Sequence, residues 1–217
     1  MVLFLREMCK TYVYTFLLFC LPMLGQESLK ELQEISEAEM KSASQTIAFS
    51  ANPNTQNYDM VYQRLNLTVD PAVYFVSGDV TAHYKAVQPM SSITFDLAHQ
   101  LTVGSVMKGT TSLTFSQANN ELVVVLPQTL ATGTLDSLKI SYAGIPPTGQ
   151  QAFTTGTHAG TPILWTLSEP YGAKDWWPCK QDLTDKIDSL DVYLTIPQIY
   201  TAVANGLEKS QVINVNN

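Results

Sequence analysis

The chain has 217 residues and a formal net charge of −7, and only 14% of its residues are charged. A chain of this length can bury a core of its own as one domain of ordinary size. Phosphate binding needs clustered lysine and arginine, so an acidic chain with no basic cluster argues against nucleic acid as a partner. The abundance of Ser, Thr, Asn and Gln favours a secreted β protein over a helical bundle.

The N-terminus has the pattern of a targeting signal. Arg6 and Lys10 supply positive charge, the apolar run Tyr12–Leu24 follows, and Gly25 is a small residue at which a signal peptidase could cut. The run is too short to span a bilayer comfortably. We therefore predict a cleaved signal peptide at residues 1–25, which implies a secreted or periplasmic protein with no membrane span after cleavage.

A short helix and a polar linker are predicted at residues 26–57. Ser28 followed three residues later by Glu31 is typical of a capping box at a helix start. Apolar residues then recur at near-helical spacing, which predicts a surface helix at Ser28–Ser44. The segment Gln45–Asn57 is rich in Asn, Ser, Thr and Gln and predicts a linker.

From Tyr58 onward the apolar residues alternate with polar ones, which is the period of a β-strand. Strands are predicted around Val61–Val69, Val76–Ala86, Ile93–Leu97, Leu101–Val103, Leu113–Phe115, Leu122–Leu126, Leu138–Tyr142, Val192–Ile196 and Tyr200–Ala204. Many short strands separated by turn signals indicate an all-β domain, an antiparallel sandwich or a large curved sheet. We place this domain at residues 58–210 and a tail that begins another strand at residues 211–217.

Three local features of this β region are also predicted. Gly78 marks a bulge or a sharp bend within its strand. Asn119 and Asn120 suit the positive backbone angles of a tight hairpin turn. The small-residue segment Phe153–Thr161 is predicted to be a loop.

The sequence offers no set of residues for catalysis or metal binding. His83, His99 and His158 are scattered, and none lies in an HExxH pattern. A zinc site needs three or four converging ligands. Cys179 is the only cysteine outside the predicted signal peptide, which excludes an intramolecular disulfide after signal removal, and no nearby partner in sequence marks it as a nucleophile. We predict no catalytic residue and no metal ligand in this chain.

The stretch Leu167–Asp191 differs from the generic strands and turns around it. It concentrates charges of both signs, and Trp176, Trp177 and Pro178 form an apolar knot within it. One interpretation is an aromatic plug that anchors a long loop to the sheet, with solvated charges around it, and we expect this for Trp177, Pro178 and Cys179. The other interpretation is that Glu169 faces a site where a cation is recognised.

The order of short motifs in this stretch resembles the N-terminal domain of the M1 family of zinc aminopeptidases. The motifs are Glu169-Pro170, Ala173-Lys174, Trp177-Pro178-Cys179 and the residues Asp182, Asp185 and Lys186. Lys174 stands where the family usually has Arg, and Leu183 where a Pro is usual. Further similarity lies at Tyr58–Pro71, Ser77–Val80, Phe95–Leu97, Ile140–Pro146 and Ala204–Gly206, so that the resemblance spans residues 57–207.

The resemblance implies a saddle-shaped, all-β N-terminal domain of a secreted metallo-aminopeptidase. In that family the zinc-binding HExxH and the GAMEN-like loop lie in the next domain, which this sequence does not reach. We therefore expect a chain cut before its catalytic domain, with no cofactor of its own and no activity alone. By the same resemblance, Glu169 binds the free α-amino group of peptide substrates, which is consistent with a carboxylate accepting a charge-assisted hydrogen bond.

An alternative is an independent secreted β module that binds a glycan or a protein. Trp165, Trp176 and Trp177 would then form an aromatic platform. A complete enzyme is excluded because the chain contains neither a nucleophile nor a metal-binding set.

Overall fold

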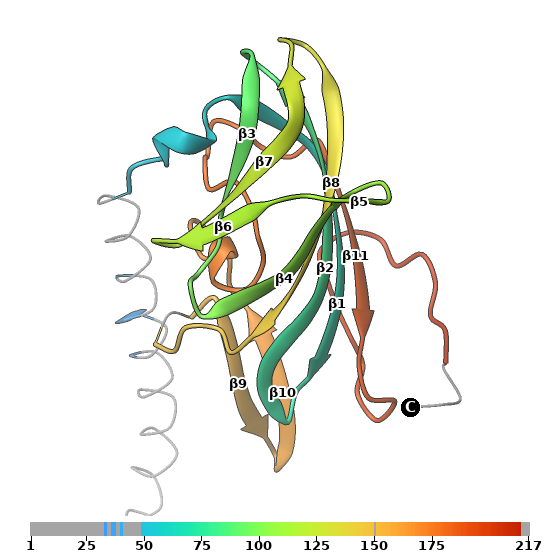
Figure 1. Cartoon of the computed structure of the whole chain (residues 1–217). Helices are drawn as coiled ribbons and strands as arrows, with labels where there is room; N and C mark the ends of the chain where they lie inside the picture. The colour runs from blue at the N-terminus through green and yellow to red at the C-terminus, as the bar shows by residue number, and fades with distance from the viewer. Residues whose placement is uncertain (1–32, 34–35, 38–39, 41–48, 150, 214–217) are drawn as a thin grey trace, which may run out of the picture. The chain divides into compact units, whose positions relative to one another are not determined.

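The computed structural model describes residues 33, 36–37, 40, 49–149 and 151–213 (Figure 1). The chain divides into two units, Met1–Ala48 and Phe49–Asn217. In the first unit, the four described residues are helical, and Gln33 Nε2 donates to Glu37 Oε1 at 3.1 Å. This agrees with the helix predicted there, whereas the predicted signal peptide lies outside the described residues.

The second unit is built from β-strands, so the predicted all-β class is confirmed. Its elements are η1 (Pro53–Thr55), β1 (Tyr58–Asp70), β2 (Val73–Ala86), β3 (Met90–Asp96), β4 (Leu101–Lys108), β5 (Thr111–Ser112), β6 (Phe115–Ala118), β7 (Glu121–Leu130), β8 (Leu135–Gly144), β9 (Phe153–His158), β10 (Thr161–Thr166), η2 (Ala173–Asp175) and β11 (Ser189–Thr195). The six-stranded sheet has the order β11-β1-β2-β8-β4-β5, the three-stranded sheet has the order β3-β7-β6, and β9 and β10 form a hairpin.

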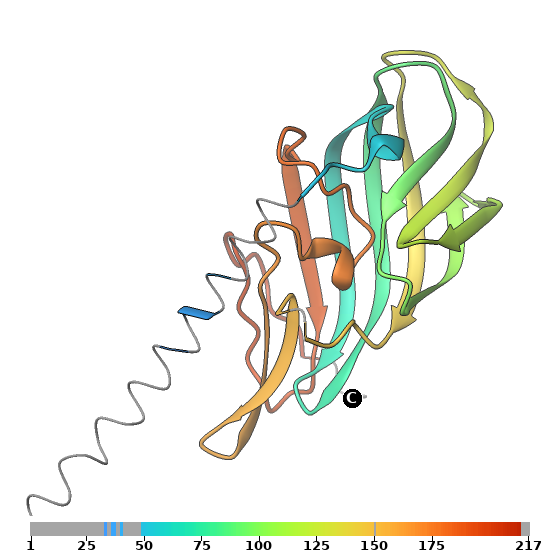
Figure 2. The ribbon, with the colours of Figure 1, turned by 90° about the vertical axis from the view of Figure 1, so that its left-hand side faces the viewer.

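The core lies between the two larger sheets, which Figure 2 shows beside each other. Alternate residues of β1 and β2 point inward, as the period of two predicted. Fully buried members include Leu65, Val80 and Tyr84 from the six-stranded sheet and Phe95 and Leu122 from the three-stranded sheet. Burying one such aliphatic or aromatic side chain contributes about 1.5–3 kcal/mol to the stability of the fold. The shared core therefore holds the two sheets together, and the loops at their ends are supported by both.

Gly78 lies in a continuous stretch of paired strand, and the predicted bulge at this position is wrong. Register shifts occur instead between Met60 and Tyr62 and between Val69 and Asp70. Glycine is required at position 78 for another reason: its φ is 154°, and a Cβ there would lie 2.1 Å from Asn66 O. The glycine therefore permits a close approach of β1 and β2.

Two further predictions about strands are wrong. Phe153–His158 is a strand rather than a loop, because it finds a partner in β10 along its whole length. Tyr200–Ala204 forms no strand. The segment contains the strand-forming residues Tyr200, Thr201 and Val203 but has no neighbouring strand to pair with, and β propensity is expressed only through such pairing.

The turn between β6 and β7 is tight, as the sequence predicted. Asn119 and Asn120 have φ values of 54° and 61°, which confirms the tight turn between β6 and β7.

β11 lies at the edge of the six-stranded sheet and pairs with β1 in parallel, whereas the sequence predicted an antiparallel arrangement throughout. A parallel neighbour requires a long crossover, and in this domain the crossover includes the whole stretch from Leu167 to Asp188.

Among the residues that the structure describes, no helix is long and apolar enough to cross a membrane.

Candidate functional site

Glu169 lies on a tight turn, Ser168–Gly172, that follows β10. The turn is closed at its base, where Gly172 N donates to Ser168 O at 2.8 Å. The residue before the turn, Leu167, donates its backbone N–H to Ala152 O at 3.1 Å. Both ends of the turn are therefore held, while the Glu169 side chain is exposed. The Glu169-Pro170 peptide bond is cis.

Gly172 is packed too closely for any side chain. A Cβ at this position would lie 2.7 Å from Leu167 O and 2.8 Å from the Ala152 Cβ. The turn thus folds back against the segment that enters β9. This glycine could not be singled out from the sequence, because nothing in its local sequence shows which backbone atoms approach it.

Trp176 lies behind the turn and contacts it directly. Its Nε1 donates to Ser168 Oγ at 3.0 Å, and its backbone carbonyl accepts a hydrogen bond of 2.7 Å from Tyr142 OH on β8. Its ring is edge-on to that of Trp177, with centroids 4.2 Å apart. Burial raises the pKa of Tyr142 well above its ordinary value, which keeps the phenol protonated as a donor. The turn is thereby tied to the central part of the six-stranded sheet.

Trp177, Pro178 and Cys179 are buried, which confirms their predicted packing role. Cys179 and Asp96 exchange two backbone hydrogen bonds, of 2.8 and 3.0 Å, so this segment pairs with the end of β3. Burial raises the pKa of the Cys179 thiol well above its ordinary value, and the nearby Asp96 raises it further. A protonated, buried thiol is not a nucleophile.

Lys180 is not solvated, contrary to the expectation that the charges of this stretch surround an apolar plug in water. Its side chain is only 5% exposed and forms an ion pair with Asp185. Lys180 Nζ also donates to Tyr58 O at 2.6 Å and lies 4.8 Å from the centre of the Tyr58 ring. The Asp185 carboxylate accepts from Met60 N at 3.3 Å. These contacts fasten the loop after the tryptophans to β1.

Gln181 joins two parts of the loop to the end of β3. Its Oε1 accepts from Lys174 N at 3.1 Å, and its Nε2 donates to Tyr171 O at 2.6 Å. Its own backbone N–H donates to Asp96 Oδ2 at 2.9 Å. A single glutamine among many carries no sequence signal, and only its burial identifies it as a structural residue.

The Glu169 carboxylate itself is free for an external partner. Within the part of the chain that the structure describes, no hydrogen bond or ion pair engages it. A carboxylate offers two acceptor oxygens and, when ionised, a negative charge. The turn can therefore present one anionic acceptor to a cationic donor, from a backbone that is fixed on both sides.

The three histidines lie on different elements: His83 on β2, His99 in the turn between β3 and β4, and His158 at the end of β9. His83 packs edge-on against Tyr62 at 5.0 Å between ring centroids, His99 Nδ1 lies 3.0 Å from Asn120 Oδ1, and His158 is exposed at the end of β9. Over residues 33, 36–37, 40, 49–149 and 151–213, no group of three or more His, Cys, Asp or Glu could hold a metal ion. These residues do not fit a zinc site.

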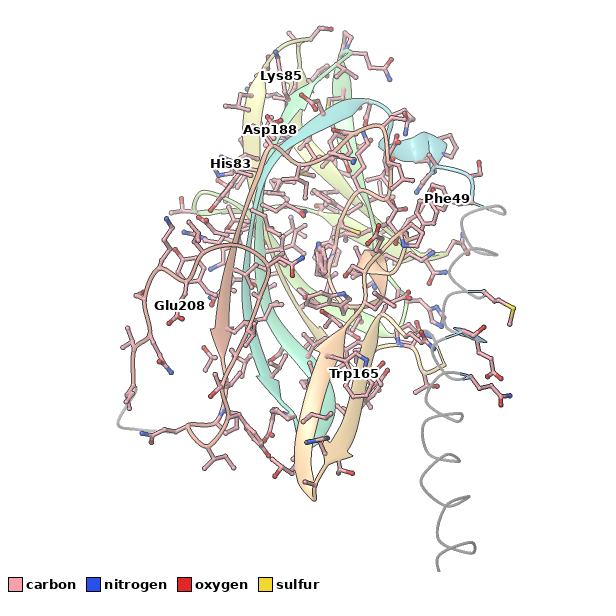
Figure 3. The ribbon with its side chains drawn as sticks, turned by 180° about the vertical axis from the view of Figure 1, so that it is seen from behind. Phe49, His83, Lys85, Trp165, Asp188 and Glu208 are labelled. Atoms are coloured by element: carbon pink, nitrogen blue, oxygen red, sulfur yellow. The ribbon has the colours of Figure 1, made fainter. Side chains whose placement is uncertain are left out.

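The three tryptophans do not form one aromatic platform. Trp165 lies on the β9–β10 hairpin (Figure 3), where it is 47% exposed and its ring lies over Gly156. Trp176 is half-buried and Trp177 is buried, and both are directed into the packing behind the turn. Only Trp165 offers a ring face of the kind that the alternative glycan-binding or protein-binding module needs.

The domain is all-β, its Ser168–Gly172 turn carries one carboxylate, that of Glu169, and its described residues include no metal-binding cluster. The family model for the peptidase M1 N-terminal domain matches residues 37–217. The chain therefore belongs to the family of M1 peptidase N-terminal domains, as the motifs around Glu169 indicated.

Solved structures agree with this assignment. The M1 zinc metallopeptidase from Deinococcus radiodurans is 27% identical with a TM-score of 0.67, and the match covers 75% of this chain and 38% of that chain. A variant of the Deinococcus radiodurans enzyme bound to a Tyr-Ser-Ala substrate is 28% identical with a TM-score of 0.65, over 74% of this chain and 37% of that one. Yeast LTA4 hydrolase, 19% identical with a TM-score of 0.55 over 66% of this chain and 24% of its own, shares the fold.

The chain thus spans only 38% of the length of the Deinococcus radiodurans metallopeptidase that it matches. A comparison with curated protein sequences finds no match.

Proposed function

We propose that this chain is the N-terminal, substrate-pocket domain of a secreted zinc metallo-aminopeptidase that removes N-terminal residues from peptides. The observation that carries the proposal is the free, exposed carboxylate of Glu169 on a turn fixed at both ends. It stands in a chain that belongs to the M1 peptidase N-terminal domain family.

Glu169 would bind the free α-ammonium group of the substrate. An ammonium is a donor of hydrogen bonds with a full positive charge, and a carboxylate is its natural acceptor. A charge-assisted hydrogen bond of this kind is worth about 1.5–3 kcal/mol when it is sheltered from water. The contact fixes where the peptide begins, and therefore which peptide bond is offered to the catalytic groups.

The relatives support this assignment of the substrate class. The Deinococcus radiodurans metallopeptidase binds Tyr-Ser-Ala as a substrate, and a two-domain M1 zinc metallopeptidase with a TM-score of 0.65 binds L-arginine. The amino acid and the tripeptide have the feature that Glu169 would recognise, an amino group that is not blocked.

The zinc ion and the catalytic residues would belong to a following domain. The described residues of this chain do not fit a zinc site, so the contribution of this chain is to bind and orient the peptide. Alone, the purified 217-residue chain is expected to show no zinc-dependent cleavage of aminoacyl chromogenic substrates. Secretion is proposed from the N-terminal signal pattern and is tested by N-terminal sequencing of the exported protein.

Glu169→Ala tests the role of Glu169 in the full-length peptidase that carries this domain. We expect a weaker affinity for peptides with a free N-terminus, by about tenfold or more for the loss of one charge-assisted hydrogen bond. The melting temperature should stay unchanged, because the side chain is exposed and free. Parallel losses of thermal stability and activity would instead make Glu169 a structural residue.

A further inference from the structure

We propose that Trp176 is the positioning residue for Glu169: its indole N–H holds Ser168 and thereby the turn that presents the carboxylate. The inference rests on the proposed function, since it concerns how the substrate-binding carboxylate is held. Trp176 itself does not contact the substrate in this proposal. It acts through the residue next to Glu169 in the chain.

Trp176 contacts the turn through a hydrogen bond to Ser168. Trp176 Nε1 donates to Ser168 Oγ at 3.0 Å, and Ser168 O accepts from Gly172 N at 2.8 Å. Ser168 is thus held through both its side chain and its carbonyl. Glu169 follows it directly, so a rotation of Ser168 would carry the Glu169 carboxylate with it.

Trp176 is itself anchored to the six-stranded sheet. Its carbonyl accepts the 2.7 Å hydrogen bond from Tyr142 OH, and Tyr142 is 4% exposed. Tyr142 pairs with Gly78 of β2 on one side and with Val103 of β4 on the other, so it belongs to an interior strand. The ring of Trp176 is also packed, with centroids 4.2 Å from Trp177 and 6.3 Å from Phe153.

The two neighbouring tryptophans differ in their hydrogen bonding. Trp177 Nε1 is buried, and among the described residues it has no hydrogen-bond partner. Both rings contribute to packing, but only the Trp176 N–H reaches the turn. Replacing each by Phe therefore separates the loss of ring volume, which the two variants share, from the loss of the hydrogen bond, which is specific to Trp176.

The test compares ligands with and without an amine in the full-length peptidase. We expect Trp176→Phe and Ser168→Ala each to raise KM for free-amine peptides about three- to tenfold, as the loss of one hydrogen bond predicts, with a smaller effect on kcat. The inhibition constant of an amine-bearing dipeptide analogue should rise equally, and that of its des-amino counterpart should not. The double variant should lose no more than either single one, because both remove the same bond.

Trp177→Phe is the matched control and should lower stability without changing the ratio of the two inhibition constants. Equal weakening of both analogues by Trp176→Phe would overturn the inference and leave Trp176 a packing residue. The inference also fails if Trp176→Phe leaves the ratio of the two inhibition constants unchanged while Glu169→Gln changes that ratio. The proposed function would then still stand.

Backbone ¹⁵N relaxation of the 217-residue chain tests the positioning without any substrate. Order parameters of the backbone N–H groups of Ser168, Glu169, Tyr171 and Gly172 should fall in Trp176→Phe and stay unchanged in Trp177→Phe. Unchanged order parameters in Trp176→Phe would overturn the inference whatever the peptide-binding data show. If Glu169→Gln leaves the binding of free-amine peptides unchanged, the proposed function fails, and the inference that rests on it fails with it.

Discussion

Lys180 and Asp185 form a largely buried ion pair that ties the loop after the tryptophans to the first strand of the domain. Their side chains are 5% and 12% exposed, and both also bond to the backbone of β1, at Tyr58 O and Met60 N. The pair thus closes the base of the loop whose other end carries Glu169. Its contribution is to the position of the loop rather than to any chemistry.

Lys180→Met should destabilise the domain by about 3–5 kcal/mol, because it leaves the Asp185 carboxylate buried without its cation. Urea unfolding followed by tryptophan fluorescence measures this change. Lys139→Met is the matched control: Lys139 pairs with Asp79 at 3.0 Å, but its side chain is 51% exposed. A pair so exposed contributes about 1 kcal/mol or less. Similar losses in the two variants would contradict the assignment of Lys180 as a buried anchor.

Gly172→Ala should destabilise the domain by about 1–3 kcal/mol through overpacking, since its Cβ has no room beside Leu167 O. The φ of Gly172 is −91°, so steric contact alone causes the loss. Gly104→Ala is the control, because the nearest atom to a Cβ there is Ser141 O at 3.8 Å. Thermal unfolding of the two variants compares them. A Gly172→Ala variant as stable as the parent would show that the turn is not packed as described.

Asp59→Asn should raise the melting temperature at neutral pH. Burial raises the pKa of Asp59, and its hydrogen bond and charge contact with Asp185 raise it further. A carboxyl with a raised folded-state pKa contributes stability that is complete below the ordinary aspartate pKa and is lost as the pH rises through the folded value. At pH 7 the ionised Asp59 therefore opposes folding, and the neutral amide does not.

Thermal unfolding followed by circular dichroism from pH 3 to pH 8 checks this expectation. The difference between Asp59→Asn and the parent should shrink as the pH falls below about 4, where the aspartate becomes neutral in both states. The exposed Glu208→Gln controls for the change in net charge. A stabilisation that is equal at all pH values would contradict the electrostatic cause.

The sequence by itself determined the class of fold, most of the strands and the family. Alternation of apolar residues predicts strands because one face of a sheet is buried, and this pattern needs no knowledge of the partner strand. The motifs from Glu169 to Lys186 likewise keep their order along the chain, so the family could be identified without a structure. The positive φ values of Asn119 and Asn120 followed from local turn chemistry.

Only the tertiary structure decided which strands pair and what holds Glu169. Phe153–His158 became a strand and Tyr200–Ala204 did not, because strand formation depends on a neighbour that is distant in the sequence. The hydrogen bond from Trp176 to Ser168 and the contact of Lys180 with Tyr58 join residues that no local pattern connects. The sequence alone pointed to Glu169 as the exposed carboxylate, whereas the contacts that orient it depend on the tertiary structure.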